Sequence, residues 1–324
     1  MRSPSRALCT LLILLAACRT GVTDVSWQSP VGREHRLVGR IWDVAAGRFV
    51  TEAAAVARIV QARYVLLGEK HDNPDHHALQ ARLLAALTAA GRRPAVAFEM
   101  LTPSQAGALA RHLSARPRDA AGIGEAVNWK ASGWPAWSIY EPIARAALEA
   151  DLPIVVANLD PERTRAVSRQ GVGALDAALI RRHGLAEALP ADVRVSLAEE
   201  IRDAHCGHAP DNLVDAMIVV QRARDAQMAE ALLTAPGSDG AVLIAGAGHV
   251  RTDRGVPAYL RRIAPTARTA SVAFLEVDPK RPDADGYAAR FDHALPFDYV
   301  WFTPAVDNED PCEKFKKSLE RLRG

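Results

Sequence analysis

The chain has 324 residues, of which 49% are hydrophobic and 24% charged, which is typical of a globular protein and excludes disordered, collagen-like and disulfide-dense classes. The formal net charge is only +2, so the clustered basic excess of a nucleic-acid-binding protein is missing. This length accommodates one large domain or two ordinary ones.

The first eighteen residues have the features of an export signal. Arg2 and Arg6 precede an apolar run over 7–17, which is shorter than the roughly 20 residues that a membrane-spanning helix needs. The run ends in Leu-Ala-Ala-Cys18, which is similar to the bacterial lipobox and implies cleavage before Cys18 and lipid attachment to its thiol. The alternative is an ordinary cleavage site followed by a chance cysteine.

Lipid chains at Cys18 would anchor the protein firmly, and Arg19 stands where an aspartate would favour the inner membrane. We therefore expect a lipoprotein of the bacterial outer membrane, on its periplasmic face. Without residues 1–17 the 40 basic groups fall by two, to 38, and balance the 38 acidic ones. The predicted parts are a signal peptide (1–17), a tether (18–36), one domain (37–304) and a polar C-terminal tail (305–324).

Strands and helices are predicted to alternate along this domain. Continuous apolar runs suit strands buried on both faces and occur at 64–67, 95–98, 154–157, 241–245, 271–277 and 298–302. Segments with helical spacing occur at 76–90, 103–113, 141–150, 161–167 and 211–233. The alternation predicts an α/β fold with a mostly parallel sheet, helices on both of its faces, and a helical insertion at about 171–210.

Polar residues follow four of the predicted strands. Ligands bind at the carboxyl ends of parallel strands, so these residues are candidates for a site: Glu69, His71, Glu99, Asn158, Asp160 and His249. Two of the strand ends share the pattern Gly-x-x-His, beginning at Gly68 and Gly246. Imidazole with carboxylate suits metal binding or acid–base chemistry. A loop cap or a structural histidine is the alternative at each position.

Two helices carry further candidates. Asn73 and Pro74 suit the start of a helix, where His77 is expected to be structural and His76 is left open between ligand and structural roles. Gln221 and Asp225 form a polar pair one helical turn apart, as support for strand-end residues or as an exposed face.

Cys206 and Cys312 follow the lipobox cysteine, in a compartment that permits disulfides. A bridge between them is the favoured interpretation and would pin the tail to the body. Free buried thiols remain open, as does metal capture by Cys206 with His205 and His208.

The segment 129–140 concentrates Trp129, Trp134, Trp137 and Tyr140. Core or hydrophobic cover is the favoured interpretation, and a flat surface for a planar ligand is the other. No G-x-S-x-G, Walker or dinucleotide motif occurs in the sequence, which disfavours serine hydrolases, nucleotidases and dehydrogenases.

Four segments together resemble the ChaN-like haem-binding lipoproteins of the Tiki/erythromycin-esterase-like superfamily: LLGEKHDNPDHHALQ, VAFEM, QRARDAQMAEAL and LIAGAGHVRTDRGVP. The resemblance spans roughly 37–277. It implies a protein of bacterial iron uptake that binds haem between α/β domains able to pair around it. It also implies that four residues form the polar crevice shared by the superfamily: Glu69, His71, Glu99 and His249. Several residues remain open as the axial haem ligand: Tyr64, Tyr140, His76, His205 and His208.

Two functional hypotheses follow. The first is a membrane-tethered haem carrier that works with an outer-membrane haem receptor, with these haem-contacting candidates: Glu69, His71, His76, Glu99, Tyr140 and His249. The second is a hydrolase that holds Zn or Mn through His71, His249 and Glu69, with Glu69 or Glu99 as the general base. A third, weaker hypothesis is a structural lipoprotein whose crevice is vestigial.

Overall fold

The computed structural model describes residues 26–237, 239–291, 293–310, 312–314 and 316. The predicted signal peptide and Cys18 lie outside these residues. No helix in the described ranges is both long and apolar enough to cross a membrane. Part of the predicted tether is described and packs on the domain: Ser29 is buried, and its backbone N–H donates to Asp75 over 2.9 Å.

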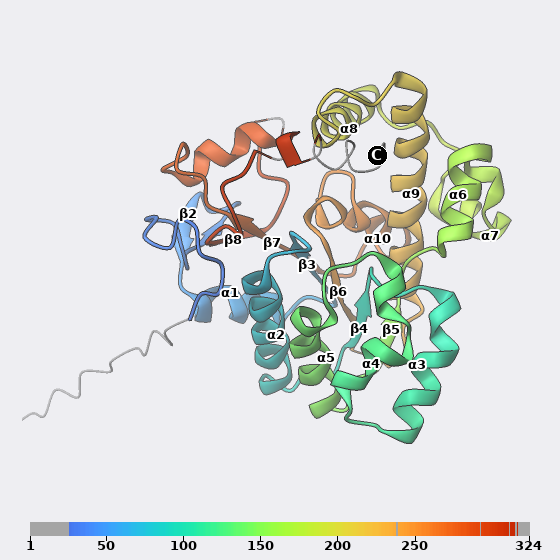
Figure 1. Ribbon diagram of the computed structural model, residues 1–324, viewed down its shortest axis with the longest axis horizontal. Helices are drawn as coiled ribbons and strands as arrows, with labels where there is room; N and C mark the ends of the chain where they lie inside the picture. Colours follow the sequence, from blue (N-terminus) through green and yellow to red (C-terminus); the bar gives the residue numbers. More distant parts are fainter. Residues whose placement is uncertain (1–25, 238, 292, 311, 315, 317–324) are drawn as a thin grey trace, which may run out of the picture.

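One eight-stranded sheet organises the molecule, in the order β2-β1-β8-β7-β3-β6-β4-β5 (Figure 1). Its strands are β1 (Ile41–Asp43), β2 (Arg48–Val50), β3 (Tyr64–Glu69), β4 (Ala95–Phe98), β5 (Ile154–Val156), β6 (Ala241–Gly246), β7 (Thr269–Glu276) and β8 (Tyr299–Thr303). The strands from β8 to β5 run parallel, whereas β1 is antiparallel to both β2 and β8. The predicted α/β fold is confirmed, and all six predicted strands are present.

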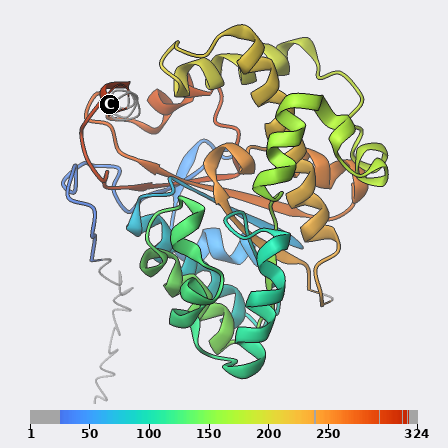
Figure 2. The same ribbon diagram turned by 45° about the vertical axis from the view of Figure 1, so that its right-hand side comes forward.

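Helices cover both faces of this sheet (Figures 1 and 2). One face carries α1 (Glu52–Ile59), α2 (Pro74–Ala89), α3 (Pro103–Ala115), α4 (Ala120–Ala126) and α5 (Trp137–Glu149). The other carries α6 (Pro161–Gln170), α7 (Ala177–His183), α9 (Asp211–Leu233) and α10 (Val256–Ile263). Along β3, Val65 and Leu67 enter the first core and Leu66 enters the second. Both faces are buried, which explains why the strands are continuously apolar.

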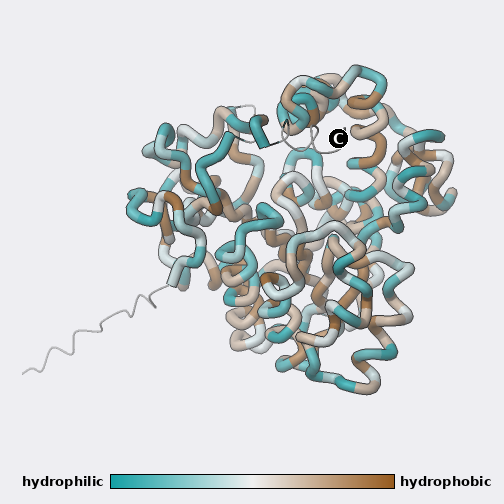
Figure 3. Tube along the Cα trace, viewed as in Figure 1, coloured by the Kyte–Doolittle hydropathy of each residue, from teal (hydrophilic) through white to brown (hydrophobic). Residues whose placement is uncertain are grey.

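Hydropathy follows this layered arrangement, with apolar segments gathered in the interior and hydrophilic ones on the outer loops (Figure 3). The buried stripe of α2 includes Leu79, Leu83 and Leu87. Its first turn is capped by Asn73, whose side chain accepts hydrogen bonds from the backbone of Asp75 and His76, and Pro74 occupies the first helical position. The cap fixes where the loop after β3 meets α2.

The region predicted as a helical insertion contains η2 (Gly171–Ala174), α7 and α8 (Ala191–Ala204). Helix α8 packs on α9 through a small separate cluster that includes Leu197 and Ile218. Cys206, just after α8, forms a disulfide with Cys312, with their Cα atoms 5.5 Å apart. Of the three alternatives for these cysteines, the structure therefore contains the bridge, which ties the segment after β8 to the α8–α9 turn.

Candidate functional site

Three of the candidate residues converge at the carboxyl ends of neighbouring strands. Strand β6 lies between β3 and β4, and Glu69 is paired in register with Gly246. Glu69 ends β3, Glu99 follows β4, and His249 lies in the 3₁₀ turn η3 (Ala247–Val250) after β6. Both carboxylates and His249 are at most 5% exposed. Buried charges need partners, and each of these groups has them.

Glu69 is held by donors from three elements. Its Oε1 accepts from His71 Nδ1 over 2.9 Å and from the Tyr140 hydroxyl over 3.1 Å. Its Oε2 lies 3.1 Å from His77 Nδ1, but the angles do not make a hydrogen bond, so this contact is electrostatic. Burial alone would raise the pKa of Glu69, but the charge of His77 and the hydrogen bonds outweigh it and lower the pKa to about 2.

His77 is a buried cation in this arrangement. Its Nε2 lies 3.0 Å from the carbonyl of His71, and its Nδ1 lies 3.2 Å from Gln80 Oε1. The Gln80 amide group donates to the Leu67 carbonyl, which leaves Gln80 Oε1 as an acceptor. Both ring nitrogens of His77 therefore face acceptors and both carry protons. Burial opposes this charge, but Glu69 outweighs it and raises the pKa of His77.

Glu99 and His249 form the second half of the site. His249 Nδ1 donates to Asp225 over 2.6 Å, and its Nε2 lies 3.3 Å from Glu99 Oε1. Burial disfavours the charged ring, but Glu99 and Asp225 outweigh it and raise the pKa of His249 to about 9. Glu99 also accepts from Arg224 and from the backbone N–H of Gly246. Asp225, on α9, supports a strand-end residue, which was one of its two expected roles.

His71 differs from the other members of this cluster. Its side chain is 32% exposed, and its Nδ1 donates to Glu69. No hydrogen bond is recorded within the described chain for its Nε2. Burial would lower the pKa of His71, but Glu69 and Glu99 raise it. In the neutral form of the ring, this carboxylate holds the proton on Nδ1 and leaves the lone pair on Nε2.

Gly246 leaves space beside this free nitrogen. Its φ of −60° suits any residue, so the backbone does not require glycine here. A Cβ at this position would lie 3.0 Å from His71 Nε2 and 3.7 Å from Glu99 Oε2. Glycine therefore keeps open the room next to Nε2.

The predicted aromatic cluster divides into two parts. Trp129 is buried and packs against Trp137 and Tyr140, as core. Trp134 is half-buried and meets His71 edge-on, with the ring centroids 4.7 Å apart. Trp129 therefore fits the interpretation as core, whereas the position of Trp134 beside His71 fits an apolar surface for a ligand.

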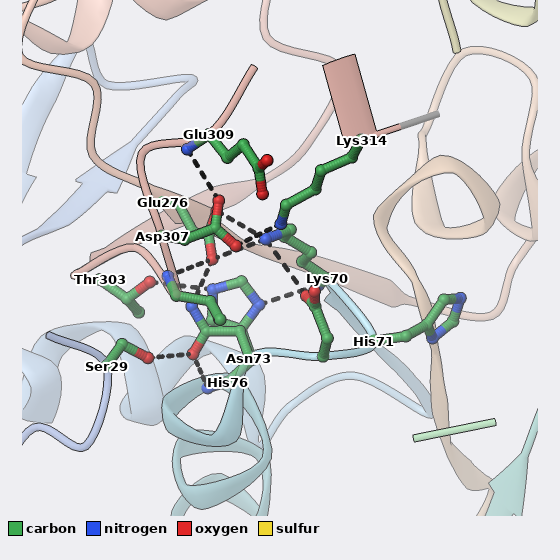
Figure 4. A network of polar contacts seen from close by, with 12 residues as sticks. Ser29, Lys70, His71, Asn73, His76, Glu276, Thr303, Asp307, Glu309 and Lys314 are labelled. Atoms are coloured by element: carbon green, nitrogen blue, oxygen red, sulfur yellow. Dashed lines mark hydrogen bonds and ion pairs between the residues drawn. The ribbon is translucent and has the colours of Figure 1, made fainter. Parts of the chain in front are cut away.

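His76, a predicted haem contact, lies apart from this cluster. It is fully buried, its Nδ1 accepts from the backbone N–H of Lys70, and its Nε2 donates to Thr303, each over 2.9 Å. Burial and the charge of His77 hold its pKa well below the ordinary value. In Figure 4 it sits in a network around Glu276 and Lys70, while the His71 ring points away. We therefore assign His76 a structural role.

The tyrosines considered as axial ligands are enclosed. Tyr140 is fully buried, and its hydroxyl lies 3.1 Å from Glu69 Oε1 and 3.2 Å from the His71 carbonyl. Tyr64 is 3% exposed and begins β3, at the opposite end of the strand. His205 and His208 follow α8, and His205 Nδ1 lies 2.7 Å from the Ile201 carbonyl. Tyr140 therefore positions Glu69, and it does not face a ligand.

The donors do not fit the Zn or Mn site that the second hypothesis requires. Among the residues with described positions, no three His, Cys, Asp or Glu side chains are grouped to hold one ion. Both nitrogens of His249 are bonded to carboxylates, and Glu99 is engaged by Arg224 and Gly246. A metal would need a neutral imidazole with a free lone pair. Among the described members of this cluster, only His71 in its neutral form has such a nitrogen.

Comparison with known proteins identifies the family of this chain. The sequence profile of the family described as haem-binding uptake, Tiki superfamily, ChaN matches residues 55–260, which include every member of the cluster. The chain belongs to the ChaN family. No curated protein matches the sequence.

Solved structures give this ChaN-family chain its fold relatives. It is similar to ChaN of Campylobacter jejuni with cofacially bound haem, at 20% identity and a TM-score of 0.62, over 81% of this chain and 95% of that one. It is also similar to the erythromycin esterase EreC in its open conformation, at 12% identity and a TM-score of 0.45, over 81% of this chain and 95% of that one. At 20% identity, the similarity to the Campylobacter jejuni protein shows the fold alone.

Proposed function

We propose that this ChaN-family protein binds haem at the carboxyl ends of β3 and β6, with His71 as the group that faces the iron. The observation that carries the proposal is the free, partly exposed Nε2 of His71. Imidazole is a common axial ligand of haem iron. When bound, haem would supply an iron centre and a large planar apolar surface.

The surroundings of His71 fit such a ligand. Glu69 holds Nδ1 and so orients the ring, Gly246 leaves room beside Nε2, and Trp134 supplies an aromatic surface next to the imidazole. Burial of the whole Glu69–His77–Tyr140 group keeps this orientation rigid. The protein's own contribution is thus to orient one nitrogen donor and to present an apolar surface.

Haem at this position supports the further proposal of a homodimer. The cavity beside Asp225 and Gly248 holds only about 10 Å³, far too little for haem, and His71 does not line it. The His71 side chain is 32% exposed, so haem bound to it would extend to the surface, where a second copy would cover the outer face of the porphyrin. The cofacial haems of the Campylobacter jejuni relative agree with such an arrangement.

We further propose that the protein is a lipid-anchored component of haem uptake at the periplasmic face of the bacterial outer membrane, where a haem receptor is its partner. The lipobox-like sequence before Cys18 supports the anchor. Palmitate labelling that is lost on Cys18→Ser, together with membrane fractionation, tests this part alone.

Haem titration of the full chain carrying Cys18→Ser tests the binding proposal. A saturable Soret shift at about one haem per chain is expected, with a change from monomer to dimer in analytical ultracentrifugation. His71→Ala should weaken haem binding at least about tenfold, because the iron loses its protein ligand. Gly246→Ala should weaken it as well, because the added Cβ crowds Nε2.

His208→Ala is the matched control, because His208 is an exposed histidine after α8 that was also considered as an axial ligand. It should bind haem like the parent chain. If His71→Ala and the parent chain titrate identically, His71 is not the ligand. If no saturable spectrum forms with either chain, haem binding itself is wrong.

A further inference from the structure

A second, larger cavity lies at the opposite end of the sheet. Its volume is about 420 Å³, within the usual range for small-molecule sites. It is an open depression bordered by α1, by the end of β1 and by the starts of β7 and β8, and Thr269 in its wall is paired in register with Tyr64. Glu69 is five residues further along β3, roughly 16 Å away at about 3.3 Å per residue. The cavity is therefore separate from the haem site.

Two carboxylates face this cavity. Asp43 is 7% exposed, and one of its oxygens accepts from the backbone of Ala46. One oxygen of Asp298 accepts from the backbone of Ser271. Among the described residues, the second oxygen of neither carboxylate has a hydrogen-bond partner. Burial raises the pKa of Asp298, and Asp43 raises it further, which means that the two carboxylates repel each other. A cationic group between them would relieve this repulsion.

Tyr299 adds a polar hydroxyl to the same wall. Its side chain is only 6% exposed and its ring belongs to the core. Its hydroxyl has no hydrogen-bond partner in the described part of the chain and is not among the buried polar atoms without one, so it is accessible from the cavity. Burial raises the pKa of Tyr299, Asp43 raises it further and Arg58 lowers it, so the hydroxyl lies among these charges. A ligand in the cavity would be its partner.

Arginines supply positive charge on the rim. Arg58 and Arg268 line the cavity and are exposed, and neither guanidinium has an ion pair among the described residues. Four alanines supply the apolar part of the wall. The cavity thus combines acidic groups inside, basic groups at the rim and small aliphatic surfaces between them.

We propose that this cavity binds a small aliphatic zwitterion, of the amino-acid or dipeptide class. Its ammonium group lies between Asp43 and Asp298 and bonds the Tyr299 hydroxyl, while its carboxylate meets Arg58 and Arg268. Guanidinium recognises carboxylate through paired hydrogen bonds, and the volume accommodates a short aliphatic body. The site is independent of haem.

Isothermal titration of the full chain with L-alanyl-L-alanine tests the proposal. Saturable one-to-one binding is expected. Acetylation of the probe's amino group or amidation of its carboxylate should each weaken binding at least about tenfold, because each removes a charged hydrogen-bonding group. Failure of all three probes to bind overturns the proposal. An amide that binds as well as the parent probe overturns it in favour of a cation site, and an acetylated probe that does so favours an anion site.

Substitutions in the cavity wall that do not disturb the fold test whether the dipeptide binds in this cavity. Asp43 and Asp298 also bond the backbone, so Arg58→Gln and Tyr299→Phe are the informative changes. Arg58→Gln should weaken binding of the dipeptide but not of its amide, and Tyr299→Phe should weaken both. Arg165→Gln on α6 is the matched control, since it removes an exposed arginine from the other face of the sheet. Affinity that is unchanged in both variants contradicts the site. Haem titrations of the same variants should match the parent chain, so the two proposals fail separately.

Discussion

Two histidines follow the same Gly-x-x-His pattern after adjacent strands, yet they differ in exposure and in the number of carboxylates that contact them. His249 is 5% exposed and lies between Asp225 and Glu99, so both of its nitrogens are bonded. The side chain of His71 is 32% exposed and has a carboxylate on one nitrogen only. A shared pattern therefore does not assign a shared role: one histidine completes a buried ion cluster, and the other presents a nitrogen.

The difference arises from what covers each strand end. The cavity wall beside His249 is formed by α8 and α9, which contribute Glu200, Gln221 and Asp225. His71 is bordered instead by Trp134, in the loop before α5, which leaves part of the ring accessible. The comparison implies that His249 variants should act on stability and that His71 variants should act on ligand binding.

The largest effect is expected from His249→Ala. It leaves Glu99 and Asp225 buried without their shared cation, and breaking a buried ion pair typically costs about 3–5 kcal/mol. Urea denaturation should show this loss of unfolding free energy. His71→Ala, measured in parallel, should lose about 1 kcal/mol or less because its site is partly solvated. Equal losses of unfolding free energy in the two variants would contradict the different roles assigned to His249 and His71.

Removal of the disulfide should come next. Cys206→Ser with Cys312→Ser opens a loop of 106 residues, and disulfides typically contribute about 2–4 kcal/mol. Hydrogen exchange should accelerate in α8, which holds to the body through a small cluster and this bridge. Haem titration at His71 should change little, because His71 lies outside the α8 wall. Faster exchange around Trp134 would contradict this division.

Alkaline pH should selectively reduce the stability that protonated His249 contributes through its contacts with Glu99 and Asp225. Its pKa is raised from 6.5 to about 9, so its protonation stabilises the fold. That contribution is complete below pH 6.5 and is lost as the pH rises through about 9. The loss should be smaller than in His249→Ala, because a neutral imidazole still donates one hydrogen bond. Urea denaturation below pH 6.5 and above pH 9 measures the loss of unfolding free energy. In His249→Gln, which cannot titrate, the unfolding free energy should depend less on pH.

The smallest effect is expected from Tyr140→Phe, which removes one donor to Glu69 and should cost about 1 kcal/mol. With one donor fewer, the Glu69 carboxylate should hold the proton of His71 more strongly and raise its pKa, which NMR titration detects. Tyr64→Phe is the control, because the Tyr64 hydroxyl contacts only Arg63 at the far end of β3. An unchanged His71 pKa would show that Tyr140 only fills space.

Much of this arrangement could be predicted from the sequence, because buried parallel strands are continuously apolar. The strand Ala95–Phe98 and the helix Asp211–Leu233 have the predicted bounds. The β1–β2 hairpin was missed, since strands of three residues carry too little periodicity.

The site was harder to predict than the fold. His77 was expected to be structural, and it contacts Glu69 from the buried side of α2, whereas the open candidate His76 bonds Thr303. Both lie on the buried side of α2, and only the placement of that helix against β3 separates them. Arg224 carried no signal beyond its position next to Asp225. A possible clue to His77 was its position seven residues before the buried Leu84, on the same helical stripe.

The sheet order has a consequence for how the polypeptide is made. Strand β3 is central, but its neighbours β6 and β7 begin at Ala241 and Thr269, so the first of them starts 172 residues after Glu69. At about 5–20 residues per second, the ribosome needs roughly 10–30 seconds to supply that partner. Throughout this interval both edges of an apolar strand lack their native partners. A nascent chain of this topology therefore depends on protection until most of its length has been synthesised.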